Sequence, residues 1–325
     1  MLCSNAARKL VFVSGRSYPA LAKEVASYLG IDVLKTTLYD FADGEIYCRY
    51  TQSVRGDDAF VFQTHCQPVN KWIMEQLIMI DALKRASVRS ITAVIPFLGY
   101  SRQDKKHLGR EPISCKLVMD LLTAAGVNRV MSVDLHSAQI QGFFNGPVDH
   151  LKALPTLVSY IKESLKGCNL AVVSPDAGRI KVSEEWSHRL GGVPLIFLHK
   201  TRDITRPNVT VSKEVVGNVY NKDCVIVDDI IDTGGTIIGA VKSLRAAGAK
   251  SVTVVATHAL LNADASEKLE NCGAREVVVT DTVPVPEEKR FKNLTVLSIA
   301  PVLAKAMKAV FNHNSVAGIF EEGAQ

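Results

Sequence analysis

The sequence repeats one pattern in its two halves. Residues 82–97 (ALKRASVRSITAVIPF) and residues 243–258 (SLRAAGAKSVTVVATH) align without a gap: a helix end, a small residue, a basic residue, a serine and then an apolar strand. A second helix–strand unit follows in each half, at residues 121–136 and at residues 268–283. Helices that alternate with short apolar strands are typical of a parallel sheet, whose crossovers run through helices on its faces. The repeat therefore predicts an α/β protein with two similar domains, each a mainly parallel sheet flanked by helices.

The two halves differ in length. The first carries extra polar and charged residues around 100–112, which we interpret as an inserted loop. At 325 residues the chain is long for one domain, and its 47% of hydrophobic residues is enough to fill two cores. We assign residues 1–152 to the first domain and residues 153–325 to the second. Within the first domain we expect strands at residues 10–14, 59–63 and 91–95, a hairpin at 38–50 and a helix at 70–86.

Residues 225–237 (VIVDDIIDTGGTI) carry the strongest functional signal. An apolar, β-branched strand leads into acids and a glycine-rich turn, and a helical pattern follows. The polar and glycine residues here are Asp228, Asp229, Asp232, Thr233, Gly234, Gly235 and Thr236. The glycines let backbone N–H groups approach a phosphate, the helix N-terminus adds partial positive charge, and the acids can accept hydrogen bonds from sugar hydroxyls. This mixture fits a phosphorylated sugar; the alternative is a buried strand followed by an acidic helix cap.

This stretch resembles the ribose-phosphate loop of type I phosphoribosyltransferases and phosphoribosyl-pyrophosphate synthetases. A nucleobase phosphoribosyltransferase needs only one such domain. A duplicated pair with the loop in its second half resembles the synthetases, also called ribose-phosphate pyrophosphokinases. The resemblance extends over nearly the whole chain, through SVRG (53–56), RQDKK (102–106), REPIS (110–114), DLHSAQIQGFF (134–144), PVDH (147–150), SPDAGR (174–179) and HKTR (199–202). It implies two type I phosphoribosyltransferase-like domains.

The resemblance also implies a reaction. The β,γ-pyrophosphoryl group of ATP moves to the C1 hydroxyl of ribose 5-phosphate, AMP leaves, and Mg²⁺ is required. Such a transfer depends on positioning and on neutralising charge. Lys200 and Arg202 match the family's catalytic loop, and Arg202 is also expected to contact ribose 5-phosphate together with the loop at 228–236. From the residues alone, a solvated basic loop after a strand at 194–198 is the simpler interpretation.

The resemblance assigns two residues to the metal site, His136 and Asp176. His136 follows an apolar strand, and Asp176 begins a turn expected to surround pyrophosphate. A lone histidine is more often structural, and imidazole is an atypical ligand for Mg²⁺. A histidine–aspartate pair completed by waters is nevertheless chemically reasonable.

The resemblance places ATP on the hairpin and the inserted loop. The matching residues are Phe41, Asp43, Gly44, Glu45, Arg102 and Gln103. Phe41 is expected to stack on adenine, and Arg102 can donate to phosphate oxygens. Asp43 stands where the family usually has Asn, and an ionised carboxylate cannot donate a hydrogen bond. The simpler interpretation of Asp43 and Gly44 is a good hairpin turn.

The composition argues against several other classes of protein. The net charge of +5 is mild and no basic run stands out, so a nucleic-acid partner is not indicated. The seven cysteines are scattered without a CxxC pair, which is typical of reduced thiols in the cytoplasm. No apolar run is long enough for a membrane span. The resemblance implies a homohexamer built from dimers.

Two rival functions stay open: a non-catalytic, synthetase-associated regulatory subunit and a nucleobase phosphoribosyltransferase. The intact HKTR segment and loop acids favour the enzyme. Many family members are regulated by phosphate or ADP through serine hydroxyls, and this chain has Ala138 and Ala317 at two of those places. His150 stands where Asn is often found. We therefore expect weaker activation by phosphate.

Overall fold

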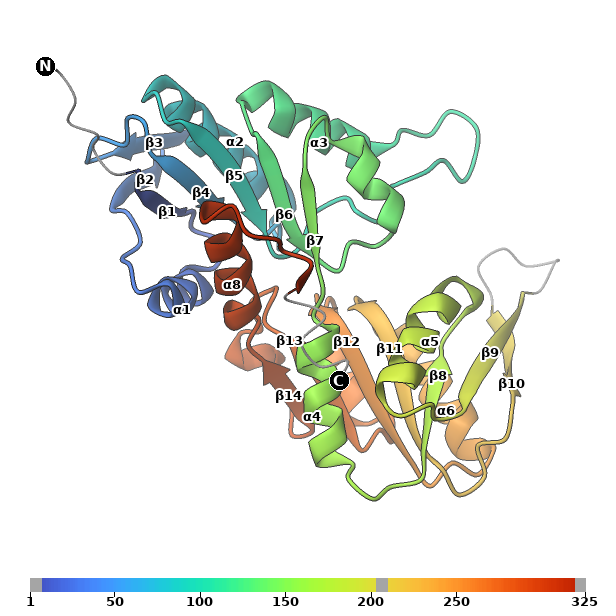
Figure 1. The fold of residues 1–325 in the computed structure, drawn as a ribbon. Coiled ribbons are helices and arrows are strands. Elements are labelled where there is room, and N and C mark those ends of the chain that lie inside the picture. The colour runs from blue at the N-terminus through green and yellow to red at the C-terminus, as the bar shows by residue number, and fades with distance from the viewer. Residues whose placement is uncertain (1–7, 203–209, 319–325) are drawn as a thin grey trace, which may run out of the picture. The chain divides into compact units, whose positions relative to one another are not determined.

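The computed structural model describes residues 8–202 and 210–318, and for residues 177, 200–202 and 210–213 it describes the backbone alone. The described chain divides into two compact units, one of residues 8–152 with 300–318 and the other of residues 153–299 (Figure 1). Among the described residues, no helix is both long and apolar enough to cross a membrane.

The first unit is built on a five-stranded parallel sheet in the order β1-β4-β5-β6-β7. Its strands are β1 (Leu10–Ser14), β4 (Asp58–Phe62), β5 (Ser90–Ile95), β6 (Arg129–Val133) and β7 (Val148–Leu151). Its helices are α1 (Pro19–Leu29), α2 (Val69–Arg85), α3 (Ser114–Ala125), the 3-10 helix η1 (Ala138–Phe143) and α8 (Ala300–Phe311). Every residue of β4 is buried, as expected for a central parallel strand covered on both faces.

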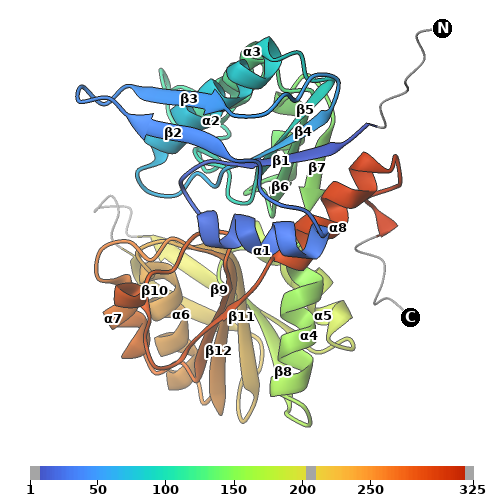
Figure 2. The ribbon, with the colours of Figure 1, turned by 90° about the vertical axis from the view of Figure 1, so that its left-hand side faces the viewer.

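A separate two-stranded hairpin belongs to the first unit. It consists of β2 (Thr36–Asp40) and β3 (Ile46–Tyr50), paired antiparallel with Asp40 opposite Ile46. Leu38, Cys48 and Tyr50 pack against the hydrophobic core, and the Tyr50 hydroxyl donates to the Met79 carbonyl of α2 at 2.9 Å. The hairpin is thus fixed at its base, while its turn extends away from the core (Figure 2).

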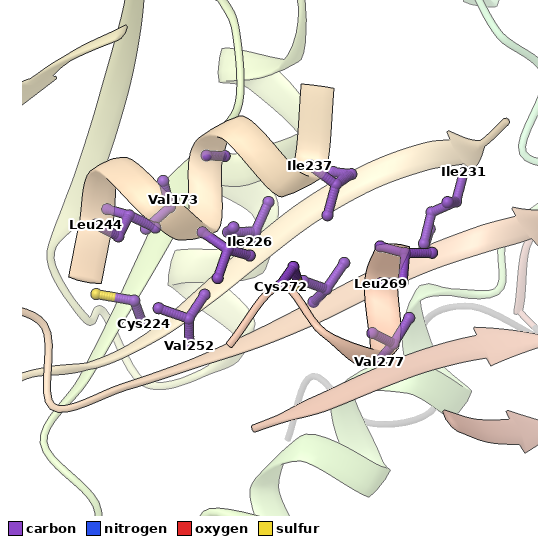
Figure 3. Packing of buried hydrophobic residues seen from close by; sticks show 14 of the residues in the cluster. Val173, Cys224, Ile226, Ile231, Ile237, Leu244, Val252, Leu269, Cys272 and Val277 are labelled. Carbon is purple, nitrogen blue, oxygen red and sulfur yellow. The ribbon is translucent and has the colours of Figure 1, made fainter. Parts of the chain in front are cut away.

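The second unit is built on a seven-stranded sheet in the order β10-β9-β8-β11-β12-β13-β14, parallel except for β10. Its strands are β8 (Leu170–Ser174), β9 (Leu195–Arg202), β10 (Thr210–Val216), β11 (Asp223–Ile231), β12 (Ser251–Ala259), β13 (Glu276–Thr280) and β14 (Leu294–Leu297). Its helices are α4 (Leu154–Ser164), α5 (Ile180–Arg189), α6 (Gly235–Ala246), α7 (Ala265–Glu270) and the 3-10 helices η2 (Ala177–Arg179) and η3 (Glu287–Lys289). Figure 3 shows Ile237 and Leu244 of α6 packed near Ile226 of β11, inside the buried core.

The two units share one topology. The order β1-β4-β5-β6-β7 in the first corresponds, strand for strand, to β8-β11-β12-β13-β14 in the second. The hairpins also correspond along the chain, since β2–β3 precede β4 and β9–β10 precede β11. The predicted fold class, two mainly parallel sheets flanked by helices in a type I phosphoribosyltransferase-like arrangement, is therefore confirmed.

The structure differs from the sequence-based division in one place. Helix α8 belongs to the first unit, where it lies beside α1, and the Arg8 guanidinium lies over the Phe311 ring at 4.3 Å (Figure 2). Leu303 and Met307 of α8 are buried. An amphipathic terminal helix can cover either of two similar cores, and its own pattern of apolar residues does not distinguish them.

Candidate active site

The strand–turn–helix at residues 225–237 forms as predicted, although the strand is longer. β11 continues to Ile231, so Asp228 and Asp229 lie within the strand, and α6 begins at Gly235. Gly234 has φ 75°, and a Cβ there would meet Ile238 Cδ1 at 3.3 Å, so glycine is required. Apart from its chain neighbours and the backbone of its own helix, no atom of the described residues lies within 4 Å of where a Gly235 Cβ would be. The backbone at the start of α6 is therefore open to a ligand, at the carboxyl end of a central strand.

The two adjacent acids of β11 face one cation. Arg179 Nε lies 3.4 Å from Asp228 Oδ1, and Arg179 Nη2 forms an ion pair with Asp229 Oδ2. The Asp229 N–H also donates to Asp228 Oδ1 at 2.9 Å. Burial, followed by the neighbouring charge of Asp229, raises the pKa of Asp228, and Arg179 opposes this rise. The Arg179 guanidinium therefore offsets part of the cost of holding two adjacent carboxylates largely away from water.

Asp232 shapes the turn that follows. Asn262 Nδ2 donates to Asp232 Oδ1 at 2.7 Å, and the Asn262 N–H donates to the Asp232 carbonyl at 3.0 Å. Thr233 is exposed and Thr236 is half-buried in the first turn of α6. Asn262, a residue that the sequence analysis missed, therefore holds Asp232 at the start of the predicted phosphate turn.

Asp176 begins a second turn in the same unit, after β8. Asp176 Oδ1 accepts the Gly178 N–H at 2.9 Å, and the Asp176 carbonyl accepts the Ser174 hydroxyl at 2.8 Å and the Arg179 N–H at 3.3 Å. One carboxylate oxygen thus fixes the turn while the other keeps its acceptor capacity, which suits Mg²⁺, an ion that is usually held by one or two carboxylates plus waters and phosphates.

His136, the other predicted metal ligand, lies in the first unit, half-buried between β6 and η1. Because Asp176 lies in the second unit, their pairing at one metal stays a prediction. Among residues 8–202 and 210–318, no group of three or more His, Cys, Asp or Glu side chains is placed to hold a metal ion.

The predicted ATP hairpin carries an aromatic cluster. Tyr39 stacks on Tyr47 with 4.8 Å between ring centroids, and Phe41 meets both rings edge-on. The Phe41 side chain is 46% exposed and so is available to a planar ligand. The sequence analysis missed Tyr39 and Tyr47, although Tyr39 lies two residues before Phe41 and strand alternation places such side chains on one face.

Asp43 forms a hydrogen bond within the hairpin turn. Its Oδ1 accepts the Glu45 N–H at 3.1 Å, and the Gly44 N–H donates to the Phe41 carbonyl at 2.9 Å. Gly44 has φ 92°, a conformation that favours glycine. These contacts support the simpler interpretation of Asp43 as a turn residue, and its contact with a nucleotide stays a prediction.

Ion pairs anchor the hairpin next to its turn. Asp40 pairs with Arg16 Nη2 at 2.5 Å and with Lys71 Nζ at 2.6 Å, and the Lys71 bond followed by the Arg16 bond lowers the pKa of Asp40. Arg16 Nε also donates to Glu75 Oε2 at 2.6 Å. None of these residues was singled out from the sequence, because the pairs join segments that are far apart in the chain.

The inserted loop contacts the segment that carries His136. Asp104 is 6% exposed and accepts the Ser137 hydroxyl at 2.5 Å and Gln139 Nε2 at 3.1 Å. Next to it, Gln103 Oε1 accepts the Ser114 hydroxyl at 2.6 Å, and Arg102 is exposed. The structure therefore brings the predicted nucleotide residues of the loop close to the His136 segment of the same unit.

The prediction that the strand before HKTR ends at residue 198 is wrong. β9 continues through Arg202, because β10 pairs with it antiparallel and places Lys213 opposite Lys200 and Thr210 opposite Arg202. The side chains of Lys200 and Arg202 lie outside the described residues, as do residues 203–208 of the predicted mobile loop. Their catalytic roles stay predictions.

Comparison with known proteins gives the family. A family model described as the N-terminal domain of ribose phosphate pyrophosphokinase matches residues 10–126, and one described as a phosphoribosyl synthetase-associated domain matches residues 196–321. The ribose-phosphate pyrophosphokinase of Bifidobacterium longum is 68% identical over 316 residues, which cover 97% of this chain and 93% of the relative. The chain belongs to the ribose-phosphate pyrophosphokinase family.

Other family members agree with this assignment. The ribose-phosphate pyrophosphokinase of Mycobacterium leprae is 55% identical over 314 residues, or 97% of this chain and 96% of the relative. The crystal structure of phosphoribosylpyrophosphate synthetase from Mycobacterium smegmatis superimposes with a TM-score of 0.91 at 55% identity, covering 94% of this chain and 100% of that one. This ribose-phosphate pyrophosphokinase therefore makes phosphoribosyl pyrophosphate from ATP and ribose 5-phosphate.

Proposed function

We propose that the two units divide the substrates of this ribose-phosphate pyrophosphokinase, with ribose 5-phosphate on the second unit and ATP on the hairpin and inserted loop of the first. The observation that carries this division is the loop at residues 228–236. It combines half-buried acids at the end of β11 with an open helix N-terminus at Gly235. The corresponding place in the first unit, after β4, has the sequence QTHCQPVN (63–70), which has neither the acid pair nor the glycine pair.

Ribose 5-phosphate fits this loop in one direction. Its 5-phosphate accepts hydrogen bonds from the backbone N–H groups and threonine hydroxyls at Thr233–Gly234–Gly235–Thr236, where the α6 dipole favours negative charge. Its ring hydroxyls then donate to Asp228 and Asp229 on β11. Arg202 supplies a further cation for the sugar phosphate. This orientation directs C1 away from the phosphate turn.

ATP binds through the first unit. The exposed Phe41 ring stacks on adenine, supported by Tyr39 and Tyr47. Glu45 and the turn at Asp43–Gly44 line the nucleotide beside it. Arg102 donates in a bidentate manner to phosphate oxygens, and Gln103 adds an amide.

His136 and Asp176 hold Mg²⁺ in this proposal. The carboxylate of Asp176 is the hard oxygen ligand that suits the ion, and the Asp176 turn is already formed by its bonds to Gly178 and Ser174. When bound, Mg²⁺ neutralises charge on the phosphate oxygens of ATP.

The transfer is a displacement at phosphorus. The C1 hydroxyl oxygen forms a bond to the β-phosphorus of ATP, the bond from that phosphorus to the oxygen bridging the α-phosphate breaks, and AMP leaves with that oxygen. The hydroxyl proton passes to solvent or to a neighbouring oxygen. Lys200 and Arg202 meet the negative charge on the migrating group, where fixed cations contribute most to the rate.

A cytoplasmic homohexamer completes the proposal. The resemblance supports the assembly, and the free thiols of the described cysteines support a reducing compartment. These cysteines are Cys48, Cys66, Cys115, Cys168, Cys224 and Cys272. Sedimentation velocity of the purified chain tests the assembly, with a hexamer expected and a stable monomer contradicting it.

Product analysis tests the reaction and its rivals together. Phosphorus NMR of a mixture of ATP, ribose 5-phosphate and Mg²⁺ is expected to show AMP and phosphoribosyl pyrophosphate in equal amounts. A nucleobase phosphoribosyltransferase would instead consume phosphoribosyl pyrophosphate and a base, and a regulatory subunit alone would form neither product.

A further inference from the structure

Arg179 links the Asp176 turn to strand β11, two elements of the second unit that are proposed to contact different substrates. Its backbone lies in η2, and its N–H donates to the Asp176 carbonyl at 3.3 Å, inside the turn expected at the pyrophosphate. Its guanidinium leaves that turn and meets Asp228 and Asp229 of β11. No role for Arg179 was predicted from the sequence.

The positive charge of Arg179 stabilises the ionised forms of Asp228 and Asp229. The side chains of Asp228 and Asp229 are 13% and 10% exposed, so two neighbouring carboxylates are largely removed from water. Burial and mutual repulsion both favour protonation, which would turn one acceptor into a donor. The Arg179 side chain is itself 13% exposed and presents Nε to one acid and Nη2 to the other.

The geometry orders both acids. Arg179 Nε lies 3.4 Å from Oδ1 of Asp228, and Arg179 Nη2 pairs with Oδ2 of Asp229. A planar guanidinium that contacts both acids limits the directions in which the two carboxylates can point. Two carboxylates held side by side in this way match two neighbouring hydroxyls on a ribose ring.

We propose that Arg179 is a positioning residue for ribose 5-phosphate, which aligns Asp228 and Asp229 for the ribose 2- and 3-hydroxyls and links that alignment to the Asp176 turn. This inference rests on the proposed function of the loop at residues 228–236. It makes Arg179 a determinant of sugar selectivity, because a site built to bond a hydroxyl rejects an analogue that lacks it.

The test compares Arg179→Met, which keeps length without charge, with Arg179→Lys, which keeps charge without the planar fork. Lys181→Met, at an exposed position of α5, is the matched control. Steady-state kinetics and calorimetry with ribose 5-phosphate and 2-deoxyribose 5-phosphate are measured on the full chain, with thermal melting of each variant.

For Arg179→Met we expect KM and Kd for ribose 5-phosphate to rise about 10- to 100-fold, because two charged hydrogen bonds no longer order the acids. KM for ATP should change less than about threefold. The preference for ribose over 2-deoxyribose 5-phosphate should fall about 10-fold, and Arg179→Lys should recover part of the affinity. Lys181→Met should match the wild type.

Three outcomes would overturn the inference. One is a folded Arg179→Met variant with wild-type affinity and sugar preference. Another is a rise in KM for ATP alone, which would make Arg179 a nucleotide ligand. The third is an equal loss for both sugars together with a lower melting temperature, which would make its role structural. If Gly235→Val also keeps normal ribose 5-phosphate affinity, the loop assignment itself fails; if only Arg179→Met does, the loop assignment survives without Arg179.

Discussion

Arg16 Nε donates to Glu75 Oε2 at 2.6 Å, and the Glu75 side chain is completely buried. Glu75 Oε1 also accepts the Arg16 N–H at 2.7 Å and Gln63 Nε2 at 2.9 Å. The same guanidinium pairs with Asp40, the residue before Phe41. A buried carboxylate in α2 thereby fixes the strand that ends at the proposed adenine platform.

We predict that Arg16→Met destabilises the first unit and weakens ATP binding. Removing one partner of a buried ion pair leaves an uncompensated charge, which costs roughly 3 kcal/mol. KM for ATP should rise about 10-fold, because Asp40 loses Arg16 and keeps Lys71 as its remaining described ion-pair partner. Urea unfolding and steady-state kinetics measure the two effects. Arg49→Met, on the exposed face of β3, is the control, and an Arg16→Met variant indistinguishable from it would refute the anchoring role.

A second prediction concerns pH. His65 is buried; its Nδ1 accepts the Gly99 N–H at 3.1 Å, so Nε2 carries the proton and donates to Gln76 Oε1 at 2.9 Å. Burial lowers the pKa of His65 from 6.5 to about 4. Since the folded pKa lies below the unfolded one, the neutral ring stabilises the fold above pH 6.5, and this stability is lost as the pH falls toward 4.

The measurement is the free energy of unfolding at pH 7 and 4.5 for the wild type and for His65→Asn, which keeps an acceptor near Gly99. Between these pH values the wild type should lose roughly 2–3 kcal/mol more than the variant. Equal losses in the two proteins would show that His65 does not titrate as its burial requires.

The parallel sheets could be predicted because their strands are buried on both faces and therefore appear as continuous apolar runs. β1 was predicted at its observed bounds, residues 10–14. The predicted end of β9, at residue 198, was too early. HKTR is polar, and its strand depends on pairing with β10, which no local pattern reveals. Propensity yields to such tertiary pairing.

The candidate site, like the fold, could be predicted only in part. The turn at Gly234 and Gly235 was predictable, since its conformation is a local property of glycine next to an acid-terminated strand. The bridge from Arg179 to Asp229 and the contact of Asp104 with Ser137 were not, because each joins segments far apart in the chain that meet only after the sheets have formed. Judged by residue type alone, these four side chains look like ordinary charged and polar surface residues.

The phosphate turn gives a third prediction. Gly235→Val should fold, because in the described part of the chain nothing beyond its neighbours and its own helix backbone lies within 4 Å of the new Cβ, and the backbone there needs no positive φ. It should nevertheless raise Kd for ribose 5-phosphate by at least 10-fold, because a branched side chain fills the approach to the N–H groups of α6. Calorimetry measures this; a folded variant with normal affinity would move the 5-phosphate elsewhere.

A fourth prediction concerns regulation. Ala138 and Ala317 offer a phosphate ion no side-chain donor, and His150 Nε2 already accepts the Leu135 N–H at 2.9 Å, so that nitrogen is not a donor to phosphate. We expect weak activation by phosphate, and stronger activation in an Ala138→Ser, Ala317→Ser double variant, since each charged hydrogen bond contributes about 1.5–3 kcal/mol. Initial rates against phosphate at constant ionic strength decide this. Strong activation of the wild type below millimolar phosphate would contradict it.

The most direct test of the account is the rate of AMP release from ATP in the presence of ribose 5-phosphate and Mg²⁺, for the wild type and for Lys200→Ala. We predict AMP release that depends on ribose 5-phosphate, and a kcat lower by about 10²–10⁴ in the variant with little change in KM for ribose 5-phosphate, because a cation that meets the migrating group acts mainly in the transition state. AMP release that is independent of ribose 5-phosphate, or a Lys200→Ala variant with near-normal kcat, would contradict the account.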